Sequence, residues 1–389
     1  MSLSNITLTA AVRQNLLSLQ GTADLLATTQ GRLATGKKVN SALDNPTNFF
    51  TAAGLDARAS DISNLLDSIG NGVQVLQAAN TGITSLSKLV DTAKSIANQV
   101  LQQPSGYSAR STVTSAAALG GTAANLVDGV TIKSGQTIIV AANGSLPALT
   151  VTIGASESLD QLNTALAAGN LTASLDSANK LVITTTNDYA SSTIGAVTVG
   201  STPGTATFGA AVAPVADAVS QATRASLVGQ YNQIISQITT TAQDASFNGI
   251  NLLNGDSLKL VFNETGKSTS TITGVTFSPT GLGLAALTSG TDFLDNSSTN
   301  AVLTKLNTAS TTLRSQASAF GANLSIVQIR QDFNKNIINV LQTGSSALTL
   351  ADSNEEAANS QALSTRQSIA TSALSLANQS QQSVLQLLR

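Results

Sequence analysis

The sequence contains no histidine, no cysteine, no tryptophan and only one methionine in 389 residues. Without imidazole and thiolate groups, the chain cannot build the common zinc sites, a Ser-His-Asp triad or the usual haem and iron–sulfur ligation. We therefore expect no metal, no cofactor and no catalytic residues, and we predict that the protein is not an enzyme. A fold without cysteine also does not rely on disulfides.

Charged and aromatic residues are scarce as well. Charged residues make up 10% of the chain, against roughly a quarter in an ordinary soluble protein, and aromatic residues make up 3%. So few charges protect a protein poorly against self-association. The net charge of −2 argues against electrostatic binding to nucleic acid or to a membrane surface.

Two kinds of segment that would reveal the compartment are missing from the sequence. No run approaches the roughly 18 consecutive apolar residues of a membrane span, so we expect no membrane insertion. The first twenty residues have no basic stretch ahead of an apolar one, and Arg13 interrupts the apolar candidate, so we expect no cleaved secretory signal. On these grounds the protein either stays in the cytosol or leaves by a route that needs no such signal.

Both ends of the chain carry the alternating spacing of four and three that is typical of a coiled-coil seam. The N-terminal seam positions are Val12, Leu16, Leu19, Ala23, Leu26, Gln30 and Leu33, and the C-terminal ones are Leu363, Gln367, Ala370, Leu374, Ala377, Gln381, Val384 and Leu388. The same spacing resumes after Pro46 and runs from Leu55 to Ile83. We predict long helices from both termini that form a bundle.

The middle of the chain has a different character. Segments rich in β-branched residues alternate with turns rich in Gly, Asn and Ser, which predicts strands at 130–133, 137–141, 149–153, 181–186 and 194–199. Residues 158–166 are typical of one short capped helix. Two further strands at 258–262 and 271–277, around a turn with Gly266, suggest a hairpin. The predicted fold class is α+β, with long terminal helices, a β-hairpin and an inserted α+β domain.

A single narrow seam buries too little apolar surface to offset the ordering entropy of a lone helix. Even if the two terminal helices pair, several apolar residues stay outside the seam, namely Leu17, Leu25, Ile369, Leu376 and Leu385. Neighbouring copies of the same chain are the simplest cover for them. An intramolecular bundle, soluble as a monomer, fits the spacing equally well, but the low charge and these surplus residues favour self-assembly.

Four short motifs follow one another along the chain. Residues 32–45 (RLATGKKVNSALDN) resemble the turn R-L-S-S-G-x-R-I-N-S-A-x-D, and residues 69–79 resemble the segment N-D-G-I-S-I-x-Q. Residues 247–253 (FNGINLL) resemble the turn F-N-G-V-x-L-L, and residues 375–389 resemble the ending A-N-Q-x-x-x-x-V-L-x-L-L-R. In this order the motifs resemble those of the bacterial flagellins, and the resemblance covers residues 1–100 and 225–389.

The resemblance implies an arrangement of five segments. Residues 1–45 and 346–389 would be the inner-tube helices, residues 46–105 and 219–345 would form the next helical layer with the hairpin, and residues 106–218 would be a variable, β-rich surface domain, similar to the IN-type module. The seam residues expected to carry self-assembly are Val12, Leu16, Leu19, Leu26, Leu33, Leu363, Ala370, Leu374, Ala377, Val384 and Leu388.

A flagellin would polymerise with itself into the extracellular flagellar filament, the propeller of motility, after type III export without a cleaved signal. Its further partners would be other flagellins, an export chaperone, the filament cap and the hook–filament junction proteins. Two alternatives remain at this stage. A hook–filament junction protein shares the terminal helices but forms a short ring, and a surface adhesin would bind glycans through the insert, which has few aromatic residues for stacking on sugars.

Three short motifs match known catalytic or binding motifs, but we expect each of them to be part of the helical structure. Ser85 and Lys88 match the S-x-x-K of serine acyl-enzymes but lie in a heptad helix without the companion motifs. Gly70 and Gly72 match half of a dinucleotide fingerprint, with no strand before them. The acidic cluster of Asp352, Glu355 and Glu356 is expected to open the last helix, where negative charge is favourable.

Overall fold

The computed structural model describes residues 10–200 and 207–387. The chain divides into two units. Unit 1 comprises Met1–Asn71, Leu260–Ser270 and Ile326–Arg389, and unit 2 comprises Gly72–Lys259 and Thr271–Ser325. Two of the boundaries fall within long helices, at 71–72 and 325–326, and two fall within strands, at 259–260 and 270–271. The five-segment division expected from the sequence stays a prediction.

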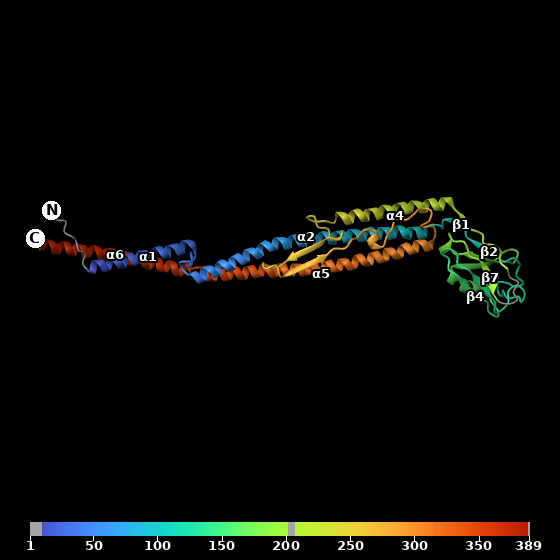
Figure 1. Cartoon of the computed structure of the whole chain (residues 1–389), viewed down its shortest axis with the longest axis horizontal. Coiled ribbons are helices and arrows are strands. Elements are labelled where there is room, and N and C mark those ends of the chain that lie inside the picture. The colour runs from blue at the N-terminus through green and yellow to red at the C-terminus, as the bar shows by residue number, and fades with distance from the viewer. Residues whose placement is uncertain (1–9, 201–206, 388–389) are drawn as a thin grey trace. The chain divides into compact units, whose positions relative to one another are not determined.

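The order of elements combines long helices at both ends with strands in the middle (Figure 1). The helices are α1 (Ala10–Thr35), α2 (Pro46–Gln102), α3 (Leu159–Leu166), α4 (Ala218–Asp244), α5 (Asn296–Thr349) and α6 (Ser353–Leu387), with short 3₁₀ turns at Ala167–Gly169, Asn187–Tyr189 and Thr280–Leu282. The strands are β1 (Tyr107–Ala109), β2 (Thr112–Thr114), β3 (Thr137–Val140), β4 (Leu149–Thr152), β5 (Leu171–Leu175), β6 (Leu181–Thr185), β7 (Val197–Gly200), β8 (Val215–Ala216), β9 (Ser257–Val261) and β10 (Thr269–Thr273). The predicted α+β class is confirmed.

The helices of unit 1 share only a small apolar core. Ala59 and Ile62 of α2 pack with Leu341 of α5, and a few half-buried neighbours surround them. The loop after β9 is fastened to the same helices. Asn334 donates to the Phe262 carbonyl at 3.0 Å, and Arg58 pairs with Glu264 at 2.7 Å. These two polar contacts hold the loop against α2 and α5.

The helices of unit 2 bury many more apolar side chains. Helix α4 runs alongside α2 there (Figure 1). Helix α4 ends at Asp244, and the turn expected at residues 247–253 follows it. Asn248 and Gly249 adopt φ angles of 51° and 80°, as the two central residues of a type I′ turn require. Asn251 then donates to the carbonyls of Ala242 and Gln243, both at 2.8 Å, and satisfies the last carbonyls of α4.

One arginine joins three segments of unit 2. Arg224 of α4 is only 1% exposed. Its guanidinium donates to the carbonyls of Phe293 at 2.6 Å, Pro104 at 2.7 Å and Gln103 at 3.1 Å. Burial lowers the pKa of Arg224, while the nearby Asp295 carboxylate raises it. The side chain thereby ties the chain after α2 and the chain before α5 to α4.

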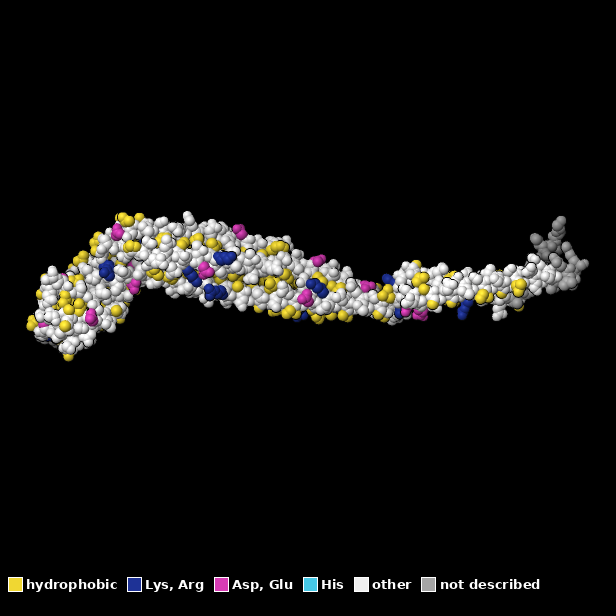
Figure 2. All heavy atoms as spheres, turned by 180° about the vertical axis from the view of Figure 1, so that it is seen from behind, with side chains coloured by type: hydrophobic (Ala, Val, Ile, Leu, Met, Phe, Trp, Pro, Cys, Tyr) yellow, Lys and Arg dark blue, Asp and Glu magenta, His cyan; other side chains and the backbone are white. Residues whose placement is uncertain are grey.

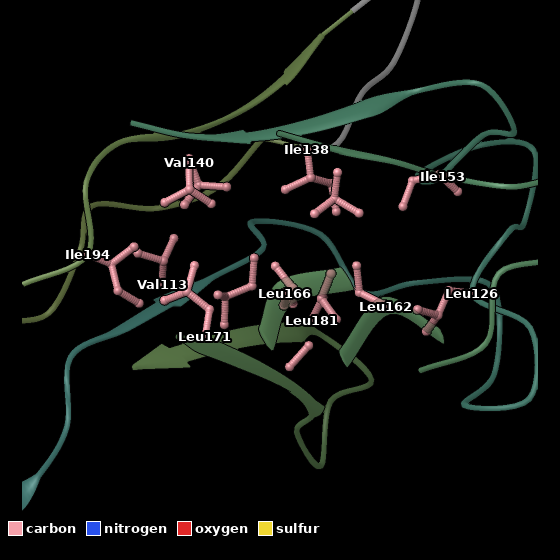
Figure 3. Packing of buried hydrophobic residues seen from close by; sticks show 14 of the residues in the cluster. Val113, Leu126, Ile138, Val140, Ile153, Leu162, Leu166, Leu171, Leu181 and Ile194 are labelled. Atoms are coloured by element: carbon pink, nitrogen blue, oxygen red, sulfur yellow. The ribbon is translucent and has the colours of Figure 1, made fainter. Parts of the chain in front are cut away.

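The insert between β1 and β8 contains two three-stranded antiparallel sheets, ordered β2-β6-β5 and β4-β3-β7. Figure 3 shows Ile138 and Val140 of β3, and Ile153 directly after β4, on the side of the core opposite Leu162 and Leu166 of α3. The labelled members of this core are Val113, Leu126, Ile138, Val140, Ile153, Leu162, Leu166, Leu171, Leu181 and Ile194. The predicted helix is confirmed, with Ser158 and Gln161 forming a capping box at its start.

Side-chain hydrogen bonds hold α3 to the edge of β5 and the insert to the start of α5. Asn163 of α3 donates to the Ala173 carbonyl at 3.1 Å and accepts from the Ala173 N–H at 2.6 Å, so that its amide pairs with the outer edge of β5. Ser191 hydrogen-bonds Asp295, and Asn296 donates to Asp188 at 3.0 Å. The start of α5 is thus linked directly to the insert.

The prediction of a strand at residues 130–133 is wrong, because the backbone N–H groups of this segment donate hydrogen bonds to one carboxylate. Asp128 accepts from the N–H groups of Val130 at 2.8 Å, Thr131 at 2.7 Å and Ile132 at 3.0 Å, and from that of Gly120 at 2.7 Å. The segment therefore forms a turn around one side chain. Partial burial would raise the pKa of Asp128, but the hydrogen bonds from Thr131, Val130, Gly120 and Ile132 hold the pKa well below its usual range.

Replacing Asp128 by Asn should lower the free energy of unfolding of the insert by about 1–3 kcal/mol, because these donors lose a charged acceptor. Since the folded pKa lies below the unfolded one, the carboxylate stabilises the fold above about pH 4, and this contribution is lost as the pH falls further. Hydrogen exchange of residues 113–199 in the full chain at pH 7 and pH 3 measures both effects. An Asp160→Asn variant, which changes an exposed carboxylate, should behave like wild type, and an Asp128→Asn variant that keeps the wild-type acid sensitivity would contradict the prediction.

Candidate self-assembly surface

The terminal helices α1 and α6 pack against each other (Figure 1). Arg32 of α1 pairs with Glu356 of α6 at 3.2 Å. At the start of α6, Asp352 accepts from the N–H of Asn354 at 2.9 Å and of Glu355 at 3.3 Å. The prediction that this acidic cluster opens the last helix is confirmed, because these N–H groups are the ones that a helix leaves without a backbone partner.

The seam residues lie in this pair but are only partly covered. Val12 is buried, whereas Leu16 and Leu33 are 37% and 43% exposed. The half-buried members are Leu19, Leu26, Leu363, Ala370, Leu374 and Ala377. Leu388 and the side chain of Val384 lie outside the described residues. Among the described side chains of α1 and α6, Val12 is the one large apolar side chain that is buried, so the pair has almost no core of its own.

Large apolar side chains also point away from the pair. Leu17 is 69%, Leu25 57%, Ile369 64% and Leu376 70% exposed. Figure 2 shows apolar side chains at intervals on one face of these helices, with few charges among them. Each helix thus leaves two large apolar side chains in water, spaced seven or eight residues apart and therefore on one face of the helix. Such faces on both helices are the candidate interaction surface.

A second exposed apolar stripe, on the C-terminal half of α5, was missed by the sequence analysis. It consists of Ile326, Ile329, Phe333 and Val340, which are 52–66% exposed. Their spacing of 3, 4 and 7 places them on one helix face, while Val327, Asn334 and Leu341 form the buried face. The spacing was present in the sequence, but only the fold shows which of the two stripes on α5 faces inward.

Two turns join the terminal helices to the rest of unit 1. Gly36 ends α1 with a φ of +68°, a conformation that glycine adopts readily. The Lys38 N–H donates to the Thr349 carbonyl at 2.8 Å, and the Ala351 N–H donates to the Gly36 carbonyl at 3.0 Å. The chain leaving α1 and the chain entering α6 therefore run together as a small two-stranded bridge.

The loop that follows is held by Asp44. Its carboxylate accepts from the N–H of Ser41 at 2.8 Å and of Asn40 at 2.9 Å, and these bonds lower the pKa of Asp44. Asn45 then accepts from the Asn48 N–H at 3.0 Å and caps α2, which begins at Pro46. The motif at residues 32–45 thus specifies one structured corner.

The motifs with possible chemistry lie in structural positions. Ser85 donates to the Thr81 carbonyl one turn earlier in α2, and Gly70 and Gly72 lie within the same helix. In the described residues, no group of three acidic side chains is arranged to hold a metal ion. Within the same part of the chain, none of the helices combines the length and apolar character needed to cross a bilayer.

Long helices toward both termini, with a sheet domain inserted between them in the sequence, define a class of helical proteins with a central insertion. Residues 6–118 match the family model of the bacterial flagellin N-terminal helical region, and residues 303–388 match that of the bacterial flagellin C-terminal helical region. Together the two matches cover just over half of the chain. The chain belongs to the bacterial flagellin family.

Among its relatives are three flagellins of Caulobacter vibrioides. FljM is 32% identical, and FljO and FljK are each 30% identical, over 165 residues. Each alignment covers 42% of this chain and 59% of the relative, so the chain spans about three fifths of the length of the curated relatives that it matches. The family is one of structural proteins.

Proposed function

We propose that the chain is the structural subunit of the bacterial flagellar filament, and that neighbouring copies polymerise by covering one another's terminal helices. The main support for the proposal is that α1 and α6 bury little apolar surface against each other. Among its described side chains the pair buries one large apolar group, Val12, and leaves Leu17, Leu25, Ile369 and Leu376 mostly in water. A pair of helices with so little core gains stability mainly from additional burial, so its folding is coupled to assembly.

The proposal gives each segment a place. Residues 1–45 and 346–389 form the inner layer, residues 46–105 and 219–345 the next layer, and residues 106–218 face the solvent. The seam residues, together with the stripe at Ile326, Ile329, Phe333 and Val340, supply the contacts between copies. The filament is extracellular and the subunit is exported without a cleaved signal. Its partners besides itself are other flagellins, an export chaperone, the filament cap and the junction proteins. The subunit has no catalytic role.

Removing residues 350–389 should abolish filament growth. The truncation deletes α6, so α1 loses the helix it packs against and the neighbouring copies lose half of the apolar surface. The test is electron microscopy of the purified full chain and the truncated chain, each seeded with short filament fragments. Long filaments from the full chain and none from the truncated one are expected.

The contrasting outcomes separate the alternatives. Tyrosine fluorescence serves as the folding control, because all three tyrosines (Tyr107, Tyr189 and Tyr231) lie in unit 2, which the truncation leaves intact. Short rings from the full chain would favour a hook–filament junction protein. Full-length chains that stay monomeric whether or not α6 is present would overturn self-assembly and favour a self-contained bundle.

A further inference from the structure

Two polar side chains occupy core positions of the insert, one on each of its three-stranded sheets. Gln136 directly precedes β3 and Ser115 directly follows β2, and they are 3% and 2% exposed. Alternate residues of an extended segment share one face. Gln136 therefore lies on the face of the buried Ile138, and Ser115 lies on the face of the buried Val113. A polar group buried at such a position is costly unless it is hydrogen-bonded.

The amide of Gln136 is only half satisfied by the protein. Its Oε1 accepts from the Lys133 N–H at 2.9 Å, which fixes the orientation of the amide. Within the described part of the chain, its Nε2 is buried without a hydrogen-bond partner. The Ser115 hydroxyl accepts from the Leu181 N–H at 3.0 Å and donates to the Ala117 carbonyl at 2.8 Å. A hydroxyl oxygen has two lone pairs, so Ser115 can accept one more hydrogen bond.

Gln136 and Ser115 line the same small cavity in the core of the insert. Its volume is about 10 Å³, and the rest of its lining is apolar. The apolar lining includes Ile138, Ile153 and Leu181, which are labelled in Figure 3. One water molecule needs a cavity of roughly 10–15 Å³ and two or more polar partners. The cavity therefore has the size for a single water and is far too small for an organic ligand.

We propose that this cavity binds one structural water molecule, which joins the two sheets of the insert. The water accepts from Gln136 Nε2 and donates to Ser115 Oγ, so that the second half of the amide is satisfied. Gln136 belongs to the sheet β4-β3-β7 and Ser115 to the sheet β2-β6-β5. In a core that is otherwise apolar, the water is a directional link that positions one sheet against the other. The site lies within the insert and is independent of filament assembly.

Counting the long-lived internal waters of the full chain tests the proposal. Magnetic relaxation dispersion of the water signal should give one water fewer in Val199→Ile and in Gln136→Met than in wild type. Val199 lines the cavity, so the added methyl group takes the space of the water, and Gln136→Met removes its donor. Val197→Ile enlarges a buried valine of the same strand outside the cavity lining and should keep the wild-type number. The same number in wild type, Val199→Ile and Gln136→Met would overturn the proposal.

The stability of the insert gives a second test, because its sign differs between a hydrated and a dry cavity. Filling a dry cavity stabilises a fold, whereas displacing a bound water leaves the Gln136 amide without a partner. Val199→Ile should therefore raise the slowest hydrogen-exchange rates of β3 and β6 in the full chain about threefold or more. In a Gln136→Met chain, which has no amide to satisfy, adding Val199→Ile should slow exchange or leave it unchanged.

Two other results would contradict the water site. Slower exchange after Val199→Ile alone would mean that the cavity is dry. Faster exchange of equal size with and without Gln136→Met would mean that the methyl group causes only steric strain, and the hydrogen bond assigned between the water and Gln136 would then be wrong. Neither result bears on the filament function, because all of these variants are compared in the unassembled chain.

Discussion

Replacing both Ile369 and Leu376 of α6 by Gln should raise the critical concentration for filament growth by about 100-fold or more. Each side chain is largely exposed in the single chain, and burial against a neighbour would contribute about 1.5–3 kcal/mol. Every 1.4 kcal/mol changes an equilibrium constant tenfold. Gln is a good helix former, so α6 itself should be unaffected. Sedimentation of seeded filaments over a series of protein concentrations measures the effect.

The same substitutions should change the thermal unfolding of the monomer little, because about two thirds of each side chain is exposed within the chain. A matched control replaces Val212 and Val219 by Gln, two valines of unit 2 that are 60% and 77% exposed. These variants should grow at the wild-type concentration. Equal effects of the two pairs would mean that exposure alone, and not position on α6, explains the result, and the assembly surface assigned to α6 would then be wrong.

Replacing Arg224 by Met should destabilise unit 2 by about 3–5 kcal/mol. The methionine fills much of the space but leaves the carbonyls of Gln103, Pro104 and Phe293 without their donor. The nearby Asp295 also loses a compensating positive charge. Urea unfolding of the monomer, followed by tyrosine fluorescence, should show a lower midpoint with an unchanged slope.

The surroundings of Tyr231 make tyrosine fluorescence a specific probe of unfolding near Arg224. Tyr231 is buried edge to face against Phe293, with ring centroids 5.8 Å apart, so its fluorescence reports on the region that Arg224 holds. Burial raises the pKa of Tyr231 to about 12, with a further contribution from Asp292, and the phenol therefore stays protonated at neutral pH. Arg314→Met, which changes an exposed arginine of α5, should shift the free energy of unfolding by less than about 0.5 kcal/mol. An Arg224→Met chain as stable as this control would contradict the assigned role.

Long-range repetition made the helices predictable. The spacing of the seams persists over several heptads, and the turn motifs at residues 32–45 and 247–253 lie at the ends of α1 and α4. The capping box of Ser158 and Gln161 likewise lies within four residues of sequence. In each case the physical cause is local, so the sequence carries it directly.

The features that were missed depend on partners far away in the chain. β2 pairs with β6 and β3 with β7, across some sixty residues of intervening chain, and β1 and β8 are too short to show a pattern. The segment after Asp128 has the composition of a strand, but a carboxylate takes its backbone donors. Helix α5 carries two apolar stripes, one with Leu341 and one with Phe333. Because α2 packs against Leu341, the stripe with Phe333 is exposed to solvent.

The amide of Asn163, which hydrogen-bonds both backbone groups of Ala173, has a consequence for a polymer with many copies of the insert on its surface. An open strand edge repeated at close, regular intervals is a template for pairing between neighbouring polymers, which would bind them into sheets. In this chain the Asn163 side chain of α3 already occupies part of the β5 edge as a strand would. We therefore expect the β5 edge to contribute little to pairing between neighbouring polymers.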